Sequence, residues 1–153
     1  MDSAPSVSAQ AVVDELETRL GYRFKDASLA LQAMTHSSSK EKERPSNERL
    51  EFFGDAVLGL VVSEYLFRTF PTYEEGDLST MKSIIVSAKT LSVCAEELGL
   101  DRVILLGRGL SDKKNIPRSI LGNAFEAVVA ALYLDDGFTR AKDFIMKNLT
   151  PQI

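Results

Sequence analysis

The sequence has little of the chemistry that marks several large classes of protein. Its 153 residues include one cysteine, one histidine and no tryptophan. The single cysteine, Cys94, cannot form an internal disulfide, and no cluster of cysteine and histidine offers a zinc site. The longest apolar stretch, Ala56 to Val62, is too short to span a bilayer, and no basic segment followed by an apolar run opens the chain. We therefore expect a cytoplasmic protein that has no membrane partner.

Positive charge is also scarce. The 18 lysine and arginine residues are outnumbered by 22 aspartate and glutamate residues, which gives a net charge of −4. Attraction of nucleic acid by bulk charge is thereby excluded, so any contact with phosphates has to be local. Two basic clusters fall in expected loops, at residues 40–44 and 113–118, where they could contact phosphates or simply keep the loops solvated.

The composition is that of an ordinary folded domain. Hydrophobic residues make up 44% of the chain and charged residues 26%, which is too apolar for a disordered protein. The length fits one domain, and we expect it to cover residues 11–150 after a flexible tail at residues 1–10. No series of strands and no internal repeat is present.

Helical spacing of apolar residues and capping residues predict an all-α fold of about seven helices. The expected helices cover residues 9–20, 27–34, 48–70, 77–87, 88–98, 118–134 and 139–149. Their expected N-caps include Ser8, Asp26 or Ser28, Asn47 and Ser87. A short apolar run at residues 103–106 is strand-like, and residues 35–45 are expected to form a loop.

The long helix after Asn47 carries an apolar face and an acidic face. The apolar stripe, which we expect in the core, comprises Leu50, Phe53, Val57, Leu60 and Val61. Glu48, Glu51 and Asp55 fall together on another side, where like charges at this spacing repel one another. A cation should compensate them: either a side chain such as Arg49 or Lys82, or a divalent ion that prefers oxygen ligands.

The helix expected at residues 118–134 also has an apolar face and a polar face. Its core stripe consists of Phe125, Val128, Val129 and Leu132. Asn123 and Glu126 lie one turn apart on another face, flanked by alanines that permit close helix packing. If the two helices pack side by side, Glu51, Asp55, Asn123 and Glu126 could converge on one oxygen-rich site. The pattern alone leaves the alternative open that these are surface acids on a solvated face.

Three single residues invite an interpretation. Phe52 lies near the acidic face and away from the core stripe, so it either marks a protein interface or contacts a neighbouring helix of the same chain. His36 has no catalytic partner pattern and is expected to make a structural hydrogen bond. Cys94 has helical neighbours typical of a core position.

Several motifs resemble those of one known family. The segment NERLEFFGDAVL, from Asn47 to Leu58, looks like the signature helix of the ribonuclease III family. Four further segments occur in the expected order, namely LGYRF at 20–24, THSS at 35–38, EEGDLS at 74–79 and LGNAFEAVVAALYLDDG at 121–137. The resemblance covers about residues 11 to 149.

The resemblance implies an all-α ribonuclease III endonuclease domain that works as a homodimer, cleaves double-stranded RNA and depends on Mg²⁺, for which Mn²⁺ may substitute. By position in the motifs, the metal would be held by Glu51, Asp55, Asn123 and Glu126, of which Asp55 and Glu126 would be catalytic. Glu48 matches the opening of the motif but not a metal ligand. Glu75, Ser79 and Lys82 match a segment that approaches the RNA backbone, and Phe52 matches the residue that inserts into the partner subunit.

The sequence departs from the family pattern in two respects. Asn123 stands where the family usually has aspartate, and an amide oxygen supplies no negative charge to a metal. The chain also ends at Ile153, where many members continue into a double-stranded-RNA-binding domain, so we expect low RNA affinity. The alternatives are therefore an endonuclease impaired at Asn123, an inactive RNA-binding scaffold of the same fold, and a helical dimerisation module without RNA.

Overall fold

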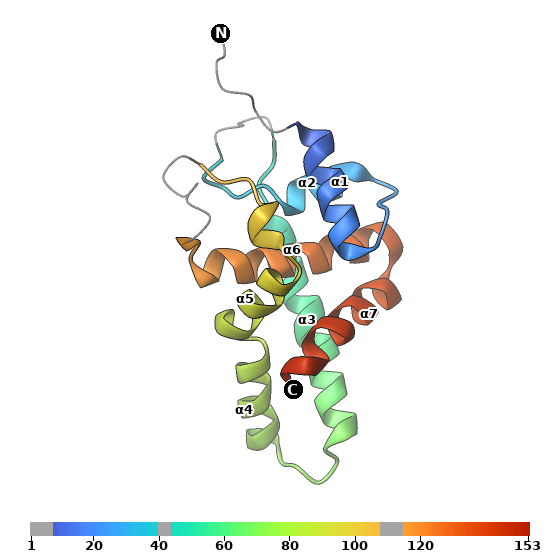
Figure 1. Cartoon of the computed structure of the whole chain (residues 1–153). Helices are drawn as coiled ribbons and strands as arrows, with labels where there is room; N and C mark the ends of the chain where they lie inside the picture. Colours follow the sequence, from blue (N-terminus) through green and yellow to red (C-terminus); the bar gives the residue numbers. More distant parts are fainter. Residues whose placement is uncertain (1–7, 40–43, 108–114) are drawn as a thin grey trace.

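Helix α6 (Arg118–Asp136) runs through the middle of the molecule, and the other helices pack around it (Figure 1). The computed structural model describes residues 8–39, 44–107 and 115–153, and these contain seven α-helices. Besides α6 they are α1 (Ala9–Leu20), α2 (Ala27–Ala33), α3 (Glu48–Thr69), α4 (Glu75–Ile85), α5 (Ala88–Glu97) and α7 (Phe138–Leu149). The predicted all-α fold of about seven helices is confirmed.

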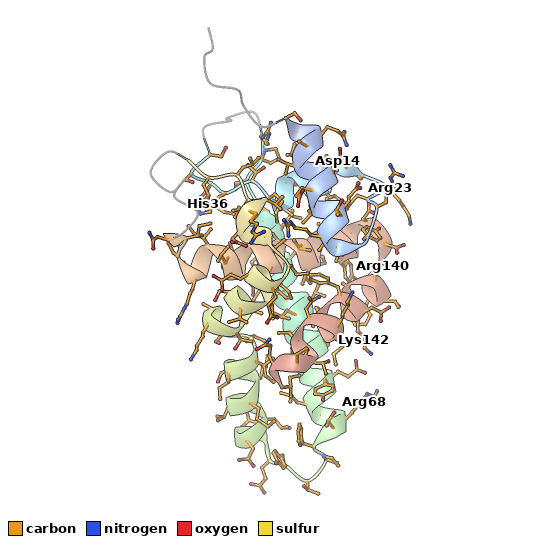
Figure 2. The ribbon with its side chains drawn as sticks, in the orientation of Figure 1. Asp14, Arg23, His36, Arg68, Arg140 and Lys142 are labelled. Carbon is orange, nitrogen blue, oxygen red and sulfur yellow. The ribbon has the colours of Figure 1, made fainter. Side chains whose placement is uncertain are left out.

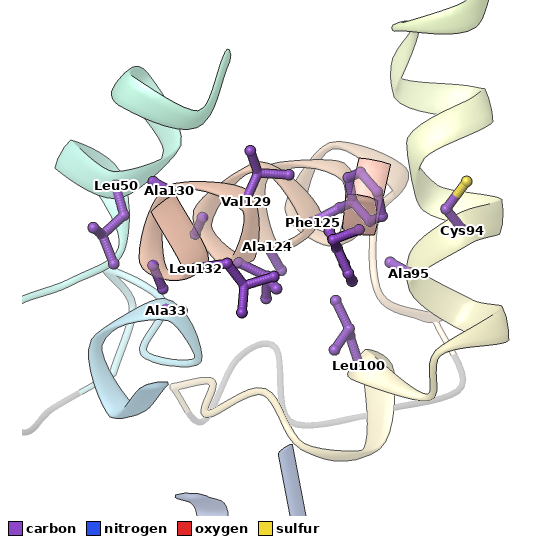
Figure 3. Close-up of a cluster of buried hydrophobic side chains, with 14 of the residues drawn as sticks. Ala33, Leu50, Cys94, Ala95, Leu100, Ala124, Phe125, Val129, Ala130 and Leu132 are labelled. Atoms are coloured by element: carbon purple, nitrogen blue, oxygen red, sulfur yellow. The ribbon is translucent and has the colours of Figure 1, made fainter. Parts of the chain in front are cut away.

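The central position of α6 follows from its composition. Every side chain from Ala124 to Leu132 is buried. Alanines alternate with larger residues in this stretch, so α2, α3, α5 and α7 can all pack closely against the helix. In the close-up of the core, Leu132 and Ala130 lie toward the α2 and α3 side, while Phe125 lies toward α5 (Figure 3). The face that carries Glu126 is therefore enclosed by neighbouring helices.

Most helix ends are fixed by the residues that the sequence suggested. The side chains of Ser8, Asp26 and Ser87 accept hydrogen bonds from first-turn amides of α1, α2 and α5. Gly21 ends α1 in the left-handed conformation at φ +64°, as expected of a C-terminal glycine. Asp26, and not Ser28, is thus the cap of α2. Residues 1–7 of the expected tail lie outside the described residues, and Ala9 already belongs to α1.

Helix α4 begins earlier than predicted. It starts at Glu75, because Glu74 and Asp77 form a reciprocal capping box in which the Glu74 amide donates to Asp77 Oδ2 at 3.3 Å. Gly76 and Asp77, predicted to open the helix, therefore lie inside its first turn. The strand-like run at residues 103–106 makes only one isolated parallel bridge, between Thr35 and Leu105, in the described part of the chain.

The prediction that Leu60 belongs to the core is wrong, since this side chain is 59% exposed. The other predicted core residues of α3 are buried or partly buried. In its second half, α3 leaves the bundle and pairs with α4 to form a projecting two-helix extension (Figure 1). One side of α3 is therefore uncovered along this extension, and Leu60 lies on it.

The segment after α2 is joined to the segment before α6. The His36 amide donates to the Leu105 carbonyl at 3.1 Å, and the Gly107 amide donates to Ser38 Oγ at 2.9 Å. His36 Nδ1 accepts a hydrogen bond from the Ser38 amide at 3.0 Å, which confirms the predicted structural role of this histidine. Burial lowers the pKa of His36, against the opposing charge of Glu48. Cys94 is buried, also as predicted.

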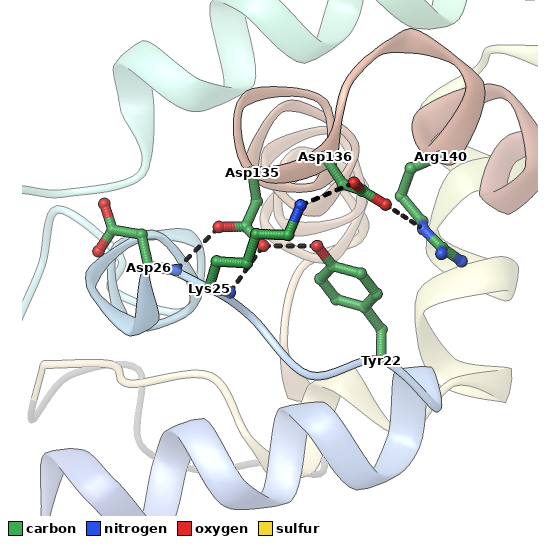
Figure 4. A network of polar contacts seen from close by, with 6 residues as sticks. All are labelled: Tyr22, Lys25, Asp26, Asp135, Asp136 and Arg140. Atoms are coloured by element: carbon green, nitrogen blue, oxygen red, sulfur yellow. Dashed lines mark hydrogen bonds and ion pairs between the residues drawn. The ribbon is translucent and has the colours of Figure 1, made fainter.

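A polar network holds the connection between α1 and α2 against the end of α6 (Figure 4). Asp135 accepts hydrogen bonds from the Tyr22 hydroxyl at 2.5 Å and from the amides of Lys25 and Asp26, both at 2.9 Å. The neighbouring carboxylate of Asp136 forms ion pairs with two side chains, Lys25 and Arg140. Loop, helix end and α7 are thereby fixed to one another.

Further cations along the α7 side of the molecule are also engaged in ion pairs. Figure 2 shows Arg68, Lys142 and Arg140 along one edge. Arg68 and Lys142 share Glu64, at 2.9 Å and 3.6 Å. No helix in the described ranges is long and apolar enough to cross a membrane. Residues 40–43 and 113–114, which belong to the two basic clusters, lie outside the described residues.

Candidate functional site

Helices α3 and α6 make their closest contact at Gly54. A Cβ atom on this glycine would lie 1.8 Å from the backbone oxygen of Glu126, far inside any allowed contact. Any side chain at this position would therefore force the two helices apart. Gly54 lies between Glu51 and Asp55 on α3, so the close contact brings the acidic side of α3 directly onto α6.

Asp55 and Glu126, two of the four predicted metal-site residues, lie close together at this contact, and the charge of Glu51 also acts on Glu126. Glu126 is only 7% exposed, and its carboxyl group shares a hydrogen bond with Asp55. Burial raises the pKa of Glu126 to about 8, and the Asp55 hydrogen bond and the charges of Asp55 and Glu51 add to the shift. Glu126 is therefore not a solvated surface acid, whereas Asp55 is exposed and Glu51 is partly buried.

Glu51 is the second carboxyl group whose charge is disfavoured. Burial raises its pKa, and the neighbouring charges of Glu48 and Asp55 raise it further. None of the ion pairs between described residues includes Glu48, Glu51, Asp55 or Glu126. Arg49, one of the compensating cations considered from the sequence, is exposed and forms none of these pairs. Within the described residues, the negative charge of the cluster is not neutralised by a cationic side chain.

Asn123 is partly buried on α6, one turn before Glu126. No hydrogen bond between described residues joins it to the carboxyl groups. Within the described ranges, no three carboxylate, histidine or cysteine side chains are arranged so that they could hold a metal ion. The chemistry of the donors nevertheless fits a hard divalent ion, because all four side chains offer oxygen.

The three residues expected to approach RNA lie on α4. Ser79 Oγ donates to Glu75 Oε2 at 2.8 Å. Lys82 lies across Gly59 of α3, where its Nζ would be 3.5 Å from an added Cβ. Lys82 and Asp55 line one concavity of about 330 Å³ between the two helices. The structure thus brings a cation next to the acidic site, while Glu75 and Ser79 are exposed farther along α4.

Phe52 is 80% exposed, so it does not contact a neighbouring helix as a core residue would. This excludes the intramolecular explanation for its position. It borders a hollow of about 640 Å³, which is also lined by Leu29, Leu50, Phe53 and Leu134. An exposed phenylalanine beside an apolar hollow is typical of a contact surface.

Two residues that shape the site were not identified from the sequence. Gly54 has a visible signal, since a glycine inside a helix is costly and needs a reason such as close packing. Asn47 was predicted to cap α3, but its side chain makes no capping hydrogen bond there. Instead Asn47 Nδ2 donates to the Ala33 carbonyl at the end of α2, at 3.1 Å. A sequence pattern cannot show this, because the partner belongs to another helix.

Comparisons with known proteins show which family this chain resembles. A family model described as Ribonuclease-III-like matches residues 26–153. Ribonuclease 3 of Rhodopirellula baltica is 45% identical over 152 residues, which cover 99% of this chain and 57% of that protein. Ribonuclease 3 of Nitratidesulfovibrio vulgaris is 49% identical over 143 residues, which cover 91% of this chain and 56% of that protein. The chain thus spans somewhat more than half the length of these relatives.

A solved structure shows the same fold. The nuclease domain of ribonuclease III from Campylobacter jejuni has a TM-score of 0.82 and 40% sequence identity, with 92% of this chain and 95% of that one covered. A second structure of that domain, with a TM-score of 0.80 and 41% identity over 90% of this chain and 99% of that one, is described as flexible in a region involved in dimer formation.

Proposed function

The chain belongs to the ribonuclease III family, and we propose that it is a Mg²⁺-dependent endonuclease domain that cleaves double-stranded RNA as a homodimer. The observation that carries the proposal is the enclosed carboxyl group of Glu126 against Asp55 and Glu51. Three acidic groups cannot bind an anionic phosphodiester unaided, because they repel it. A divalent ion held by these groups joins the acidic site to the phosphate.

In this proposal Glu51, Asp55, Asn123 and Glu126 hold the ion. When bound, Mg²⁺, or Mn²⁺ in its place, activates water and neutralises charge at the phosphate. Glu126, whose pKa is raised to about 8, must lose its proton before it can act as a charged ligand. Lys82, next to Asp55, attracts the RNA backbone, and Glu75 and Ser79 lie along the same helix. The hydrolysis would leave 5′ phosphate and 3′ hydroxyl ends.

The dimer is supported by a row of exposed residues along α3. Phe52, Leu60 and Phe67 are 80%, 59% and 72% exposed, and the small residues Ala56 and Ser63 are exposed between them. Their spacing of three and four residues places them on one face of the helix. A two-fold dimer uses the same surface on both subunits. Antiparallel packing of two such rows about Leu60 would cover the phenylalanine at either end.

Asn123 favours a second candidate function, an RNA-binding scaffold that retains the fold without cleaving. An amide gives the ion no charge, and no group of three acidic side chains in the described ranges is arranged to hold a metal. Against this candidate stand Glu51, Asp55 and Glu126 themselves. A scaffold gains nothing from carboxyl groups whose mutual repulsion destabilises the fold.

One assay separates the two functions. The protein is incubated with an RNA duplex in Mg²⁺, in Mn²⁺ and in a chelator, and the ends of the products are identified. We expect cleavage with either ion and none with chelator, and Asp55→Asn should abolish it while the helical circular dichroism is retained. Duplex binding without cleavage in either ion would establish the scaffold instead.

Analytical ultracentrifugation tests the dimer. Each Phe52 ring buried between subunits contributes about 1.5–3 kcal/mol, and the two-fold axis doubles the contribution. Phe52→Ala should therefore dissociate the dimer while the monomer remains helical. Tyr73→Ala, which also removes an exposed aromatic ring, serves as the control and should leave the dimer intact. A monomeric unmodified chain at micromolar concentration would contradict this part of the proposal.

A further inference from the structure

Asn47 occupies the N-cap position of α3 but serves another helix. Its backbone has φ −83° and ψ 5°, which is not the extended conformation usual for an N-cap, and its side chain makes no capping hydrogen bond to α3. The side-chain amide instead donates to the Ala33 carbonyl at 3.1 Å, and the backbone amide donates to the Thr35 carbonyl at 2.8 Å. Asn47 thus satisfies two carbonyl groups at and just beyond the end of α2.

Both hydrogen bonds are enclosed by protein. Asn47 is 2% exposed, Thr35 is 1% exposed and Ala33 is fully buried. The carbonyl groups at the end of a helix lack partners within the helix, and buried ones must find partners elsewhere. Asn47 provides such a partner from the position just before α3. The start of α3 is therefore joined to the end of α2 at two points that water does not reach.

This junction lies one helical turn from the acidic site. The Glu51 amide donates to the Asn47 carbonyl at 2.8 Å, so the position of Asn47 sets the direction of the turn that carries Glu51. At the other end of the same segment, Gly54 rests against the backbone of Glu126. Residues 48–53 are consequently held between two backbone contacts, one to α2 and one to α6.

We propose that Asn47 is a positioning residue for the acidic site: by capping the end of α2, it holds the first turn of α3 and thereby fixes Glu51 on the side of α3 that carries Asp55. The role requires a hydrogen-bond donor, because the partner is a carbonyl oxygen. A conventional N-cap requires an acceptor. Asparagine has both groups, whereas aspartate is an excellent N-cap with no donor. The two roles therefore predict opposite results for Asn47→Asp.

The first test measures Mn²⁺ binding by electron paramagnetic resonance, at a temperature where circular dichroism shows every variant to be folded. We expect Asn47→Asp and Asn47→Ala each to weaken binding about 10–100-fold, the range typical when a residue that orients metal ligands is lost. The added charge of the aspartate would by itself attract the cation, so a loss cannot be electrostatic. Unchanged affinity in Asn47→Asp would overturn the proposal.

A matched control separates positioning from general loosening of the fold. Leu149→Ala removes a buried side chain at the end of α7 and destabilises the protein outside α2 and α3. We expect this variant to bind Mn²⁺ like the unmodified chain. An equal loss of affinity in Leu149→Ala would show that Asn47 acts only through overall stability, and the proposal would then be wrong.

The Mn²⁺ test rests on the proposed function, so a second measurement uses the metal-free protein. Amide hydrogen exchange should accelerate at Glu51 and Phe52 in Asn47→Ala, while the amides of α6 around Glu126 keep their protection. Unchanged exchange at Glu51 would show that other contacts hold the turn, which overturns the proposal. If the unmodified chain binds no Mn²⁺, the metal-dependent function fails, while the exchange result still decides the role of Asn47.

Discussion

Two of the carboxyl groups on helix α6, those of Glu126 and Asp135, are nine residues apart and have opposite surroundings. Asp135 faces three hydrogen-bond donors, from Tyr22 and from the amides of Lys25 and Asp26. Burial alone would raise its pKa, but these hydrogen bonds outweigh burial and lower it. Glu126 faces two other carboxyl groups, and its pKa is raised to about 8.

The difference distinguishes a structural carboxylate from a functional one. A group whose lone pairs are all taken by the protein stabilises the fold and has no capacity for a ligand. A group that is buried among like charges destabilises the metal-free fold and gains most from an added cation. Substitutions at Glu126, at Asp135 and at Asn123, which lies one turn before Glu126, test this distinction.

The largest expected effect is on cleavage. Under the proposed function, Glu126→Gln should lower the rate of RNA duplex cleavage in Mg²⁺ at least about 100-fold, because a charged ligand of the proposed ion would be lost. Asp135→Asn, assayed at a temperature where it is folded, should cleave at nearly the normal rate. Similar losses in both variants would mean that the two carboxyl groups do not differ in function.

The next effect is on stability, and here Asp135 is the sensitive position. Asp135→Asn should lower the free energy of unfolding by about 2–3 kcal/mol. The carbonyl oxygen of asparagine cannot accept hydrogen bonds from all three donors, and its NH₂ group would face at least one of them. Chemical denaturation at neutral pH measures the change. A loss below about 0.5 kcal/mol would show that Asp135 is not a structural carboxylate in the sense argued above.

The pH dependence of stability should differ in sign between the two groups. The folded-state pKa of Glu126 is about 8, against 4.5 for the free group. The contribution of Glu126 to the free energy of unfolding is therefore fully present below pH 4.5. It is lost as the pH rises from 4.5 to about 8. Glu126→Gln should raise the free energy of unfolding of the metal-free protein at pH 8 by about 1–3 kcal/mol.

For Asp135 the sign is reversed. Its pKa is lowered in the folded state, so its contribution is present above the ordinary pKa of aspartate and is lost as the pH falls below it. Thermal unfolding of the metal-free variants between pH 3 and pH 8 measures both trends. Parallel pH profiles for Glu126→Gln and the unmodified chain would refute the assigned pKa of Glu126.

The smallest expected effect concerns Asn123. Asn123→Asp restores a charged ligand next to Glu126 and should raise Mg²⁺-dependent cleavage by at least about tenfold. It should slightly lower the thermal stability of the metal-free protein, because a further negative charge joins the cluster. Equal cleavage rates across a Mg²⁺ titration would show that this position does not limit the site.

The sequence predicts those parts of the molecule that are set by local spacing. Periodicity placed Glu51 and Asp55 on one side of a helix and Glu126 on a second helix, and in the structure the charges of Glu51 and Asp55 act on Glu126. Capping residues predicted most helix ends, since a cap is a contact within a few residues. The position of Phe52 is anomalous in the sequence because this residue lies outside the apolar stripe of its own helix.

The misses have a common physical cause, which is dependence on another element. Leu60 fits the core stripe of α3 but is exposed, because the extension formed with α4 leaves that side uncovered. Asn47 has the residue type of an N-cap but bonds to Ala33 of α2. Asp135 accepts hydrogen bonds from residues more than a hundred positions away in the sequence, and no local pattern predicts such contacts.

The contact at Gly54 has a consequence for the choice of ion. Backbone meets backbone there, so the distance between α3 and α6 is a rigid main-chain dimension with no side chain whose rotation could relax it. A site built across such a junction adapts to an ion only through its side-chain rotamers. Mg²⁺ binds oxygen at about 2.0–2.1 Å and Ca²⁺ at about 2.3–2.6 Å with more ligands. If the proposed ion is held between these two helices, we therefore expect their fixed spacing to favour Mg²⁺ over Ca²⁺, which competition between the two ions would measure.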